Sequence, residues 1–99
     1  MALIYHLTPN AAWQAAQGST QYATAALTEE GFIHCCEERQ LPDIRRRYFA
    51  HTQELVRLTI ETAKLASPLI YDWSPSLEDT FPHIYGPINL GAVVSVDRI

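Results

Sequence analysis

The chain has 99 residues, of which 47% are hydrophobic and 18% charged. One hydrophobic core accommodates a chain of this length, which excludes a second domain, so we expect residues 1–99 to form a single domain. Seven Lys and Arg against eleven Asp and Glu give a formal net charge of -4 at pH 7. This balance excludes the basic surface that binds polyanions through bulk charge, so a nucleic-acid partner is not expected.

Membrane and secretory classes are also disfavoured. The sequence contains no run of about 18 apolar residues that could span a bilayer. The first residues, 1–6, lack the basic segment and long apolar segment of a secretory signal. Cys35 and Cys36 are neighbours, and a disulfide between them would strain the backbone, so reduced thiols are expected. These features predict a soluble cytoplasmic protein with no membrane partner.

The first half of the chain predicts two strands and two helices. Residues 2–8 are rich in strand formers and end at the turn signal Pro-Asn, and a short helix follows over residues 11–17 until a glycine ends it. Residues 19–28 are small and polar and indicate a connecting loop with about one turn of structure. Residues 31–36 indicate a short buried strand, and the apolar spacing over residues 40–51 predicts a helix.

The second half of the chain predicts three more strands. Apolar and polar residues alternate over 54–61, which makes this the clearest strand, and a short helical turn or loop follows over 62–68. Residues 69–73 indicate another strand, 74–82 a polar loop, and 91–96 the last strand. About five short strands and two main helices that do not alternate strictly predict a compact α+β domain with mostly antiparallel strands.

Three of the four histidines lie in strongly hydrophobic segments, namely His6, His34 and His83. An unpaired histidine is costly to bury, so each needs a partner, and several that converge on one cleft would form a functional site. The alternative for each is a core histidine whose nitrogens are satisfied by the backbone. His51 follows a predicted helix end, where a cation suits the helix dipole, and is interpreted as structural.

The segment 81–87 holds two prolines and one glycine around His83 and Tyr85. These residues restrict the backbone on both sides, and a rigid loop suits a binding site. The alternative is a stiff crossover that packs Phe81 and Ile84 into the core.

A metal site is not expected from this sequence. Zinc sites usually space paired cysteines by two to four residues, whereas neighbours on a strand point to opposite faces, so Cys35 and Cys36 do not suit one ion with His34. Arg39 and the arginines at 45–47 indicate a solvated helix face. The sequence has no GxGxxG, GxxxxGK[ST] or HExxH motif, which disfavours Rossmann, P-loop and zincin enzymes.

Two longer signatures and several single residues resemble a known family. The segments GFIHC and FPHIYGP, in this order and at this distance, are similar to those of domain-of-unknown-function family 952, and the resemblance extends over nearly the whole chain. Cys36 departs from the family pattern, which commonly has serine there. The other residues that carry the resemblance are Ile4, Tyr5, His6, Trp13, Glu30, Gln40, Leu41, Ala92, Val93 and Val94.

The resemblance implies an α+β fold similar to that of the ADP-ribosyltransferases and RNA 2'-phosphotransferases, which implies a NAD-like ligand. His6 then corresponds to the first-strand histidine that contacts the ribose of NAD, and Tyr85 or Tyr22 to the aromatic ring that stacks on nicotinamide. Glu78 lies near the FPHIYGP segment, in a polar stretch with Asp79, but matches no motif for the catalytic glutamate of such transferases.

We therefore expect a histidine-lined pocket for a nucleotide-like small molecule, with or without group-transfer chemistry. His34 and His83 are the candidate catalytic acid and base. The alternative is a non-catalytic binding or interaction module in which the histidines are structural. The candidate ligand-binding residues are His6, Tyr85, Phe32 and Tyr22.

Overall fold

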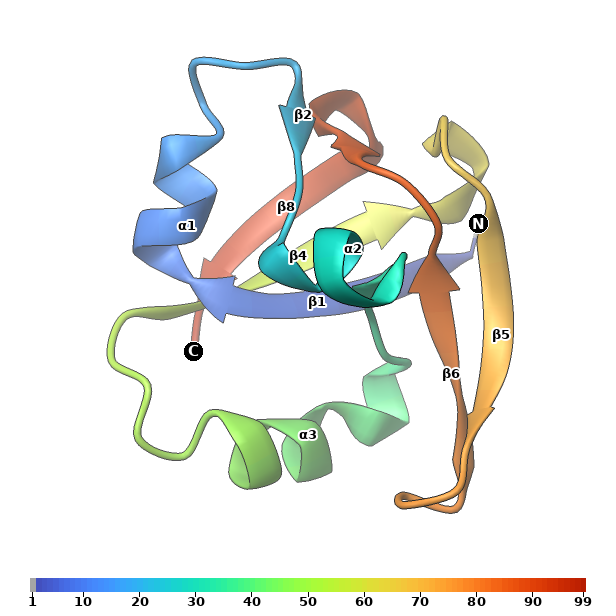
Figure 1. The fold of residues 1–99 in the computed structure, drawn as a ribbon. Coiled ribbons are helices and arrows are strands. Elements are labelled where there is room, and N and C mark those ends of the chain that lie inside the picture. The colour runs from blue at the N-terminus through green and yellow to red at the C-terminus, as the bar shows by residue number, and fades with distance from the viewer. Residues whose placement is uncertain (1) are drawn as a thin grey trace.

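The computed structural model describes residues 2–99, and within them the chain forms eight strands and three short α-helices (Figure 1). All strand pairs are antiparallel, which confirms the predicted α+β class with short antiparallel strands. The strands are β1 (Leu3–Pro9), β2 (Gln21–Tyr22), β3 (Ile33–His34), β4 (Leu55–Glu61), β5 (Leu69–Ser74), β6 (Asp79–Ile84), β7 (Ile88–Asn89) and β8 (Val93–Arg98). The helices are α1 (Asn10–Ala15), α2 (Ala25–Glu30) and α3 (Leu41–Tyr48). Short 3-10 turns lie at Glu38–Gln40, Thr62–Lys64 and Leu90–Ala92.

One three-stranded sheet has the order β1-β4-β8, with the predicted strand β4 at its centre. The register of β1 on β4 pairs Ile4 with Ile60 and His6 with Leu58, so these side chains share the buried face. Leu58 and Ile60 are both fully buried. The alternation of apolar and polar residues in β4 is visible in the sequence because the branched side chains of Leu58 and Ile60 are buried on this central strand.

A second sheet has the order β3-β6-β5 and lies beside the first (Figure 1). The backbone groups of Tyr5 and Cys36 join the two sheets through a pair of hydrogen bonds, each 2.8 Å long. This bridge places the chain directly after β3 against β1. The two sheets therefore meet along a seam that runs past the beginning of β1.

The short helices are fixed at their ends. Gly31 ends α2 in the left-handed region with φ of 90°, and its N–H donates to the carbonyl of Leu27. Pro42 occupies the first turn of α3, where it costs no hydrogen bond. The buried Gln40 side chain joins this helix to β6, because its amide donates to Asp79 Oδ2 at 2.9 Å and to the Thr80 carbonyl at 3.0 Å.

Gly86 follows β6 at a point of close packing. A Cβ at this position would lie 2.4 Å from the Ser67 hydroxyl oxygen, which itself donates to the Pro87 carbonyl at 2.7 Å. Only a glycine therefore fits between these two segments.

Several sequence predictions differ from the structure. The loop predicted over 74–82 is limited to the turn at 75–78, and the rigid loop predicted over 81–87 is limited to 85–87, because residues 79–84 form β6, the central strand of the second sheet. The predicted loop over 19–28 contains β2 and the first part of α2. The predicted helix over 40–51 ends at Tyr48, and the strand predicted over 31–36 is limited to Ile33–His34. No helix within residues 2–99 is long and apolar enough to cross a membrane.

Candidate functional site

The site is built on the pairing of β3 with β6. The register places His34 directly opposite His83, so both side chains leave the same face of the second sheet. Their ring centroids are 5.2 Å apart and the rings meet edge to face. Two histidines that are 49 positions apart in sequence number are thus neighbours because of strand register alone.

Each of these imidazoles has a carboxylate partner. Glu30, four residues before His34 at the end of α2, places Oε2 2.9 Å from His34 Nε2. Asp72 on β5 places Oδ2 2.8 Å from His83 Nδ1. A carboxylate on one ring nitrogen fixes the tautomer and the ring orientation, which leaves the other nitrogen for a ligand.

Tyr85 completes the group around Asp72. Its hydroxyl donates to Asp72 Oδ2 at 2.5 Å. This hydrogen bond, together with the weaker contribution of His83, holds the pKa of Asp72 below its usual value, while the same bond raises the pKa of Tyr85. Asp72 is therefore an ionised carboxylate that two side chains share.

Phe32 packs against all three rings of this cluster. It stacks on His83 with a centroid distance of 4.0 Å and an interplanar angle of 15°. It also contacts His34 at 4.8 Å and Tyr85 at 5.3 Å. Because the rings are packed on one another, the positions of both imidazoles depend on this phenylalanine.

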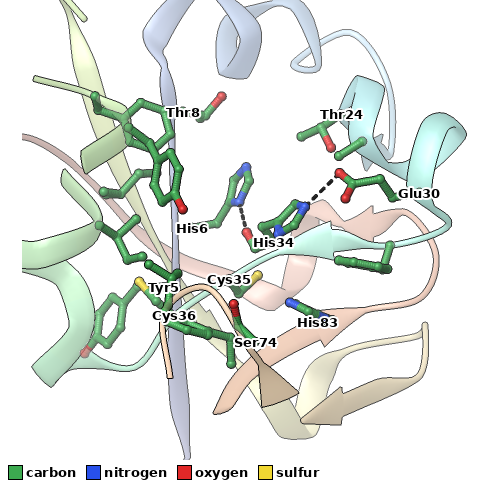
Figure 2. Close-up of a pocket in the computed structure, with 18 of the residues that line it drawn as sticks. Tyr5, His6, Thr8, Thr24, Glu30, His34, Cys35, Cys36, Ser74 and His83 are labelled. Atoms are coloured by element: carbon green, nitrogen blue, oxygen red, sulfur yellow. Dashed lines mark hydrogen bonds and ion pairs between the residues drawn. The ribbon is translucent and has the colours of Figure 1, made fainter. Parts of the chain in front are cut away.

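A cavity of about 700 Å³ opens beside this cluster, between β1, α2, the β5–β6 hairpin and the end of α3. His6, His34 and His83 all line the cavity. Figure 2 shows them around the same space, with Glu30 hydrogen-bonded to His34. Its volume lies within the range of small-molecule sites. Its aromatic wall comprises Tyr5, Phe32, Tyr48, Phe49, Trp73 and Phe81.

His6 lies deeper than the other two histidines and uses both ring nitrogens within the protein. Nδ1 lies 2.6 Å from the His34 carbonyl, and Nε2 lies 2.9 Å from the Tyr22 hydroxyl, which is itself 2.8 Å from the Thr8 hydroxyl. Burial lowers the pKa of His6 to about 4, so the ring is neutral at pH 7. A neutral ring that donates from Nδ1 to the carbonyl must accept at Nε2, so the Tyr22 hydroxyl donates to it.

The predicted site residues therefore fall into two groups. His34, His83, Phe32 and Tyr85 form the cluster at the sheet surface, whereas His6 and Tyr22 form a buried network beneath it. Tyr22 is 1% exposed and packs in the core, so its ring has no free face for a ligand. The expectation that His34 is buried is wrong, because 54% of its side chain is exposed.

Glu78, Cys35 and Cys36 take no part in the hydrogen bonds of His34 and His83, although both cysteines line the cavity. Glu78 is exposed in the β5–β6 turn with a left-handed φ of 51° and does not line the cavity. Cys35 and Cys36 are free and buried, and burial raises the pKa of both thiols, that of Cys36 to about 12. Within residues 2–99, no group of three His, Cys, Asp or Glu side chains could hold a metal ion.

Sequence reasoning missed the two carboxylates. Glu30 had a usable signal, since it precedes His34 by four residues at a helix end. Asp72 had a weaker one, an acidic residue inside an otherwise apolar strand. Its partner His83 lies on a neighbouring strand, so only the β5–β6 register makes the pair apparent.

The family described as a protein of unknown function (DUF952) matches residues 7–96. The chain belongs to this family. This membership confirms the family resemblance found in the two sequence signatures. No curated protein matches the chain.

Solved structures of protein CC0527 from Caulobacter crescentus share the fold. Its X-ray crystal structure is 28% identical, with a TM-score of 0.88 over 98% of this chain and 85% of that chain. The crystal structure of a double mutant of the same protein gives 26% identity and a TM-score of 0.87 over the same shares. The solution NMR structure gives 28% identity and a TM-score of 0.82 over 98% of this chain and 84% of that chain.

Proposed function

We propose that the protein binds a nucleotide-like small molecule in the cavity and that His34 and His83 act on it as an acid and base pair. The observation that carries the proposal is the pair of carboxylate-bound imidazoles on the cavity wall, with Glu30 at 2.9 Å and Asp72 at 2.8 Å. Neither His34 Nδ1 nor His83 Nε2 has a hydrogen-bond partner within residues 2–99. Each ring therefore has one nitrogen available to a ligand.

The chemistry of such a pair is proton transfer. One neutral imidazole accepts a proton from an attacking group while a protonated one delivers a proton to the leaving group. The carboxylates hold the orientation of each ring and leave its second nitrogen free. The resemblance to ADP-ribosyltransferases and RNA 2'-phosphotransferases suggests group transfer from a NAD-related molecule, and the aromatic wall suits a base or nicotinamide ring.

The test is an NMR titration of the labelled protein with NAD, nicotinamide riboside and adenosine, following backbone amides and histidine rings. We expect saturable shifts at Phe32, His34 and His83 with at least one of these molecules. His34→Ala and His83→Ala should each weaken binding at least tenfold. His51→Ala, at an exposed position outside the cavity, is the matched control and should bind as the wild type does.

Two results would overturn the proposal. The first is the absence of shifts with all three molecules at millimolar concentration. The second is unchanged affinity in both His34→Ala and His83→Ala, provided that their amide spectra show the native fold.

A second candidate function is a non-catalytic binding module. The observation that favours it is His6, whose two ring nitrogens are both engaged within the protein and which therefore has a structural role. Chromatography of NAD and nicotinamide riboside after long incubation with the protein separates the two functions. Release of free nicotinamide supports group transfer, and an intact ligand that nevertheless binds supports the module.

A cytoplasmic location is part of the proposal. Its support is the pair of free, buried neighbouring thiols, which is typical of reducing compartments. Fractionation of cells that express the protein at its native level tests this, and recovery with the secreted or membrane fraction would contradict it.

A further inference from the structure

The charge of the cavity wall carries information about its ligand. Among the described residues that line the cavity there is no lysine and no arginine, and Glu30 is the one fully charged side chain. Asp72 adds a second carboxylate directly behind His83. The carboxylates of Glu30 and Asp72 are therefore the permanent charges at the site, and both are negative.

Two basic side chains close to the wall are already engaged. The Arg57 guanidinium lies 5.9 Å from the centre of the Tyr5 ring, on which it forms a cation–π contact, and it pairs with Asp97 at 3.4 Å. Arg39 is held by both oxygens of Asp79, at 2.9 and 3.2 Å. A phosphate in the cavity would have to displace either of these two arginines from its carboxylate in order to bind it.

The rest of the wall suits a flat ring that carries no negative charge. Six aromatic side chains surround the cavity, and the faces of such rings attract cations and stack on planar heterocycles. A carboxylate beside aromatic faces favours positive charge further. The same carboxylate would repel the negative charge of a phosphorylated ligand.

We infer that the ligand of this cavity is a phosphate-free molecule with a planar, neutral or positively charged ring, of the nucleoside class rather than the nucleotide or dinucleotide class. This inference rests on the proposed function and specifies its substrate. The aromatic wall binds the ring, Glu30 and Asp72 repel phosphate, and His34 and His83 reach the polar atoms of the sugar or base.

The test compares two pairs of molecules that differ only by a phosphate: nicotinamide riboside against nicotinamide mononucleotide, and adenosine against adenosine 5'-monophosphate. Dissociation constants come from NMR titration at pH 7.5 and low salt. We expect the phosphate-free member of each pair to bind at least tenfold more tightly. Added salt should narrow this preference, because screening weakens the repulsion.

Variants locate the source of the preference. Glu30→Gln removes the carboxylate on the cavity wall and should narrow the affinity ratio within each pair at least threefold, even if both affinities fall. Glu29→Gln removes the same charge from the neighbouring exposed residue, which does not line the cavity, and should leave the ratio unchanged.

The outcomes separate the inference from the function on which it rests. Equal or tighter binding of the phosphorylated members, with shifts at Phe32, His34 and His83, would overturn the inference and leave the proposed function standing. An affinity ratio that Glu30→Gln does not change would also overturn it. No shifts at these residues with any of the four molecules would overturn both.

Discussion

Acidification should destabilise the protein through His6. This side chain is 6% exposed, and burial lowers the pKa of the folded state from 6.5 to about 4. The unfolded chain takes up a proton near pH 6.5, whereas the folded protein resists it until about pH 4. Between these values the unfolded state binds more protons, so the free energy of unfolding falls as the pH falls.

The size of this effect follows from the difference in pKa. From 6.5 down to about 4, each unit corresponds to about 1.4 kcal/mol, so His6 accounts for a loss of about 3 kcal/mol. That loss is a large part of the free energy of unfolding of a typical domain, which is roughly 5–15 kcal/mol. Urea unfolding between pH 7.5 and 4, followed by the fluorescence of the buried Trp13, measures it.

A single variant isolates the contribution of His6. Gln at this position retains a donor for the His34 carbonyl and an acceptor for the Tyr22 hydroxyl, but it does not titrate. Over this pH range the free energy of unfolding of His6→Gln should therefore fall by about 3 kcal/mol less than that of the wild type. The free energy of unfolding of His51→Gln should change with pH as that of the wild type does. Equal pH dependence in the wild type and His6→Gln would refute the reasoning.

Three further predictions concern packing and thiol reactivity. Gly86→Ala should lower the free energy of unfolding by about 1–3 kcal/mol in thermal scans, because the added Cβ overlaps the side chain of Ser67. The control Gly18→Ala adds a Cβ in open space and should change the free energy of unfolding by less than about 0.5 kcal/mol in the same scans. Leu58→Ala, on the central strand and fully buried, should cost about 2–5 kcal/mol in urea unfolding. Cys35 and Cys36 should react with a thiol reagent at pH 8 at least about tenfold more slowly in the folded protein than in urea, because burial raises both pKa values; fast labelling of the folded protein would contradict this.

The elements that could be predicted are those with a local signal. The alternation over β4 and the branched and aromatic residues of β5 indicated strands correctly. The strand β6 was missed because Phe81, Pro82, His83 and Ile84 are all buried, which removes the alternation, and because proline argues against a central strand. Pro82 lacks an N–H to donate, but its carbonyl still pairs with the segment after β3, where it accepts a hydrogen bond from the Cys35 N–H at 3.1 Å.

The candidate site depends on long-range pairing to a greater extent than the fold does. Their hydrophobic surroundings indicate His34 and His83 as candidate site residues, but only the register of β3 on β6 shows that the two side chains leave the same face of the sheet. The same surroundings suggested that His34 is buried, whereas its ring leaves an apolar segment toward Glu30 and solvent. Local composition indicates that a histidine needs a partner, and sheet register determines which partner it has.

His34 links the buried network of His6 to the cavity surface, so a substitution at His6 can also affect the cavity. Its carbonyl accepts a hydrogen bond from His6, while its ring lines the cavity beside His83. A substitution at His6 therefore removes a support of the backbone that carries His34, and it can weaken ligand binding without any contact between His6 and the ligand. Binding that His6→Ala loses and His6→Gln restores would assign His6 a positioning role, because Gln replaces the donor to the carbonyl but not the imidazole.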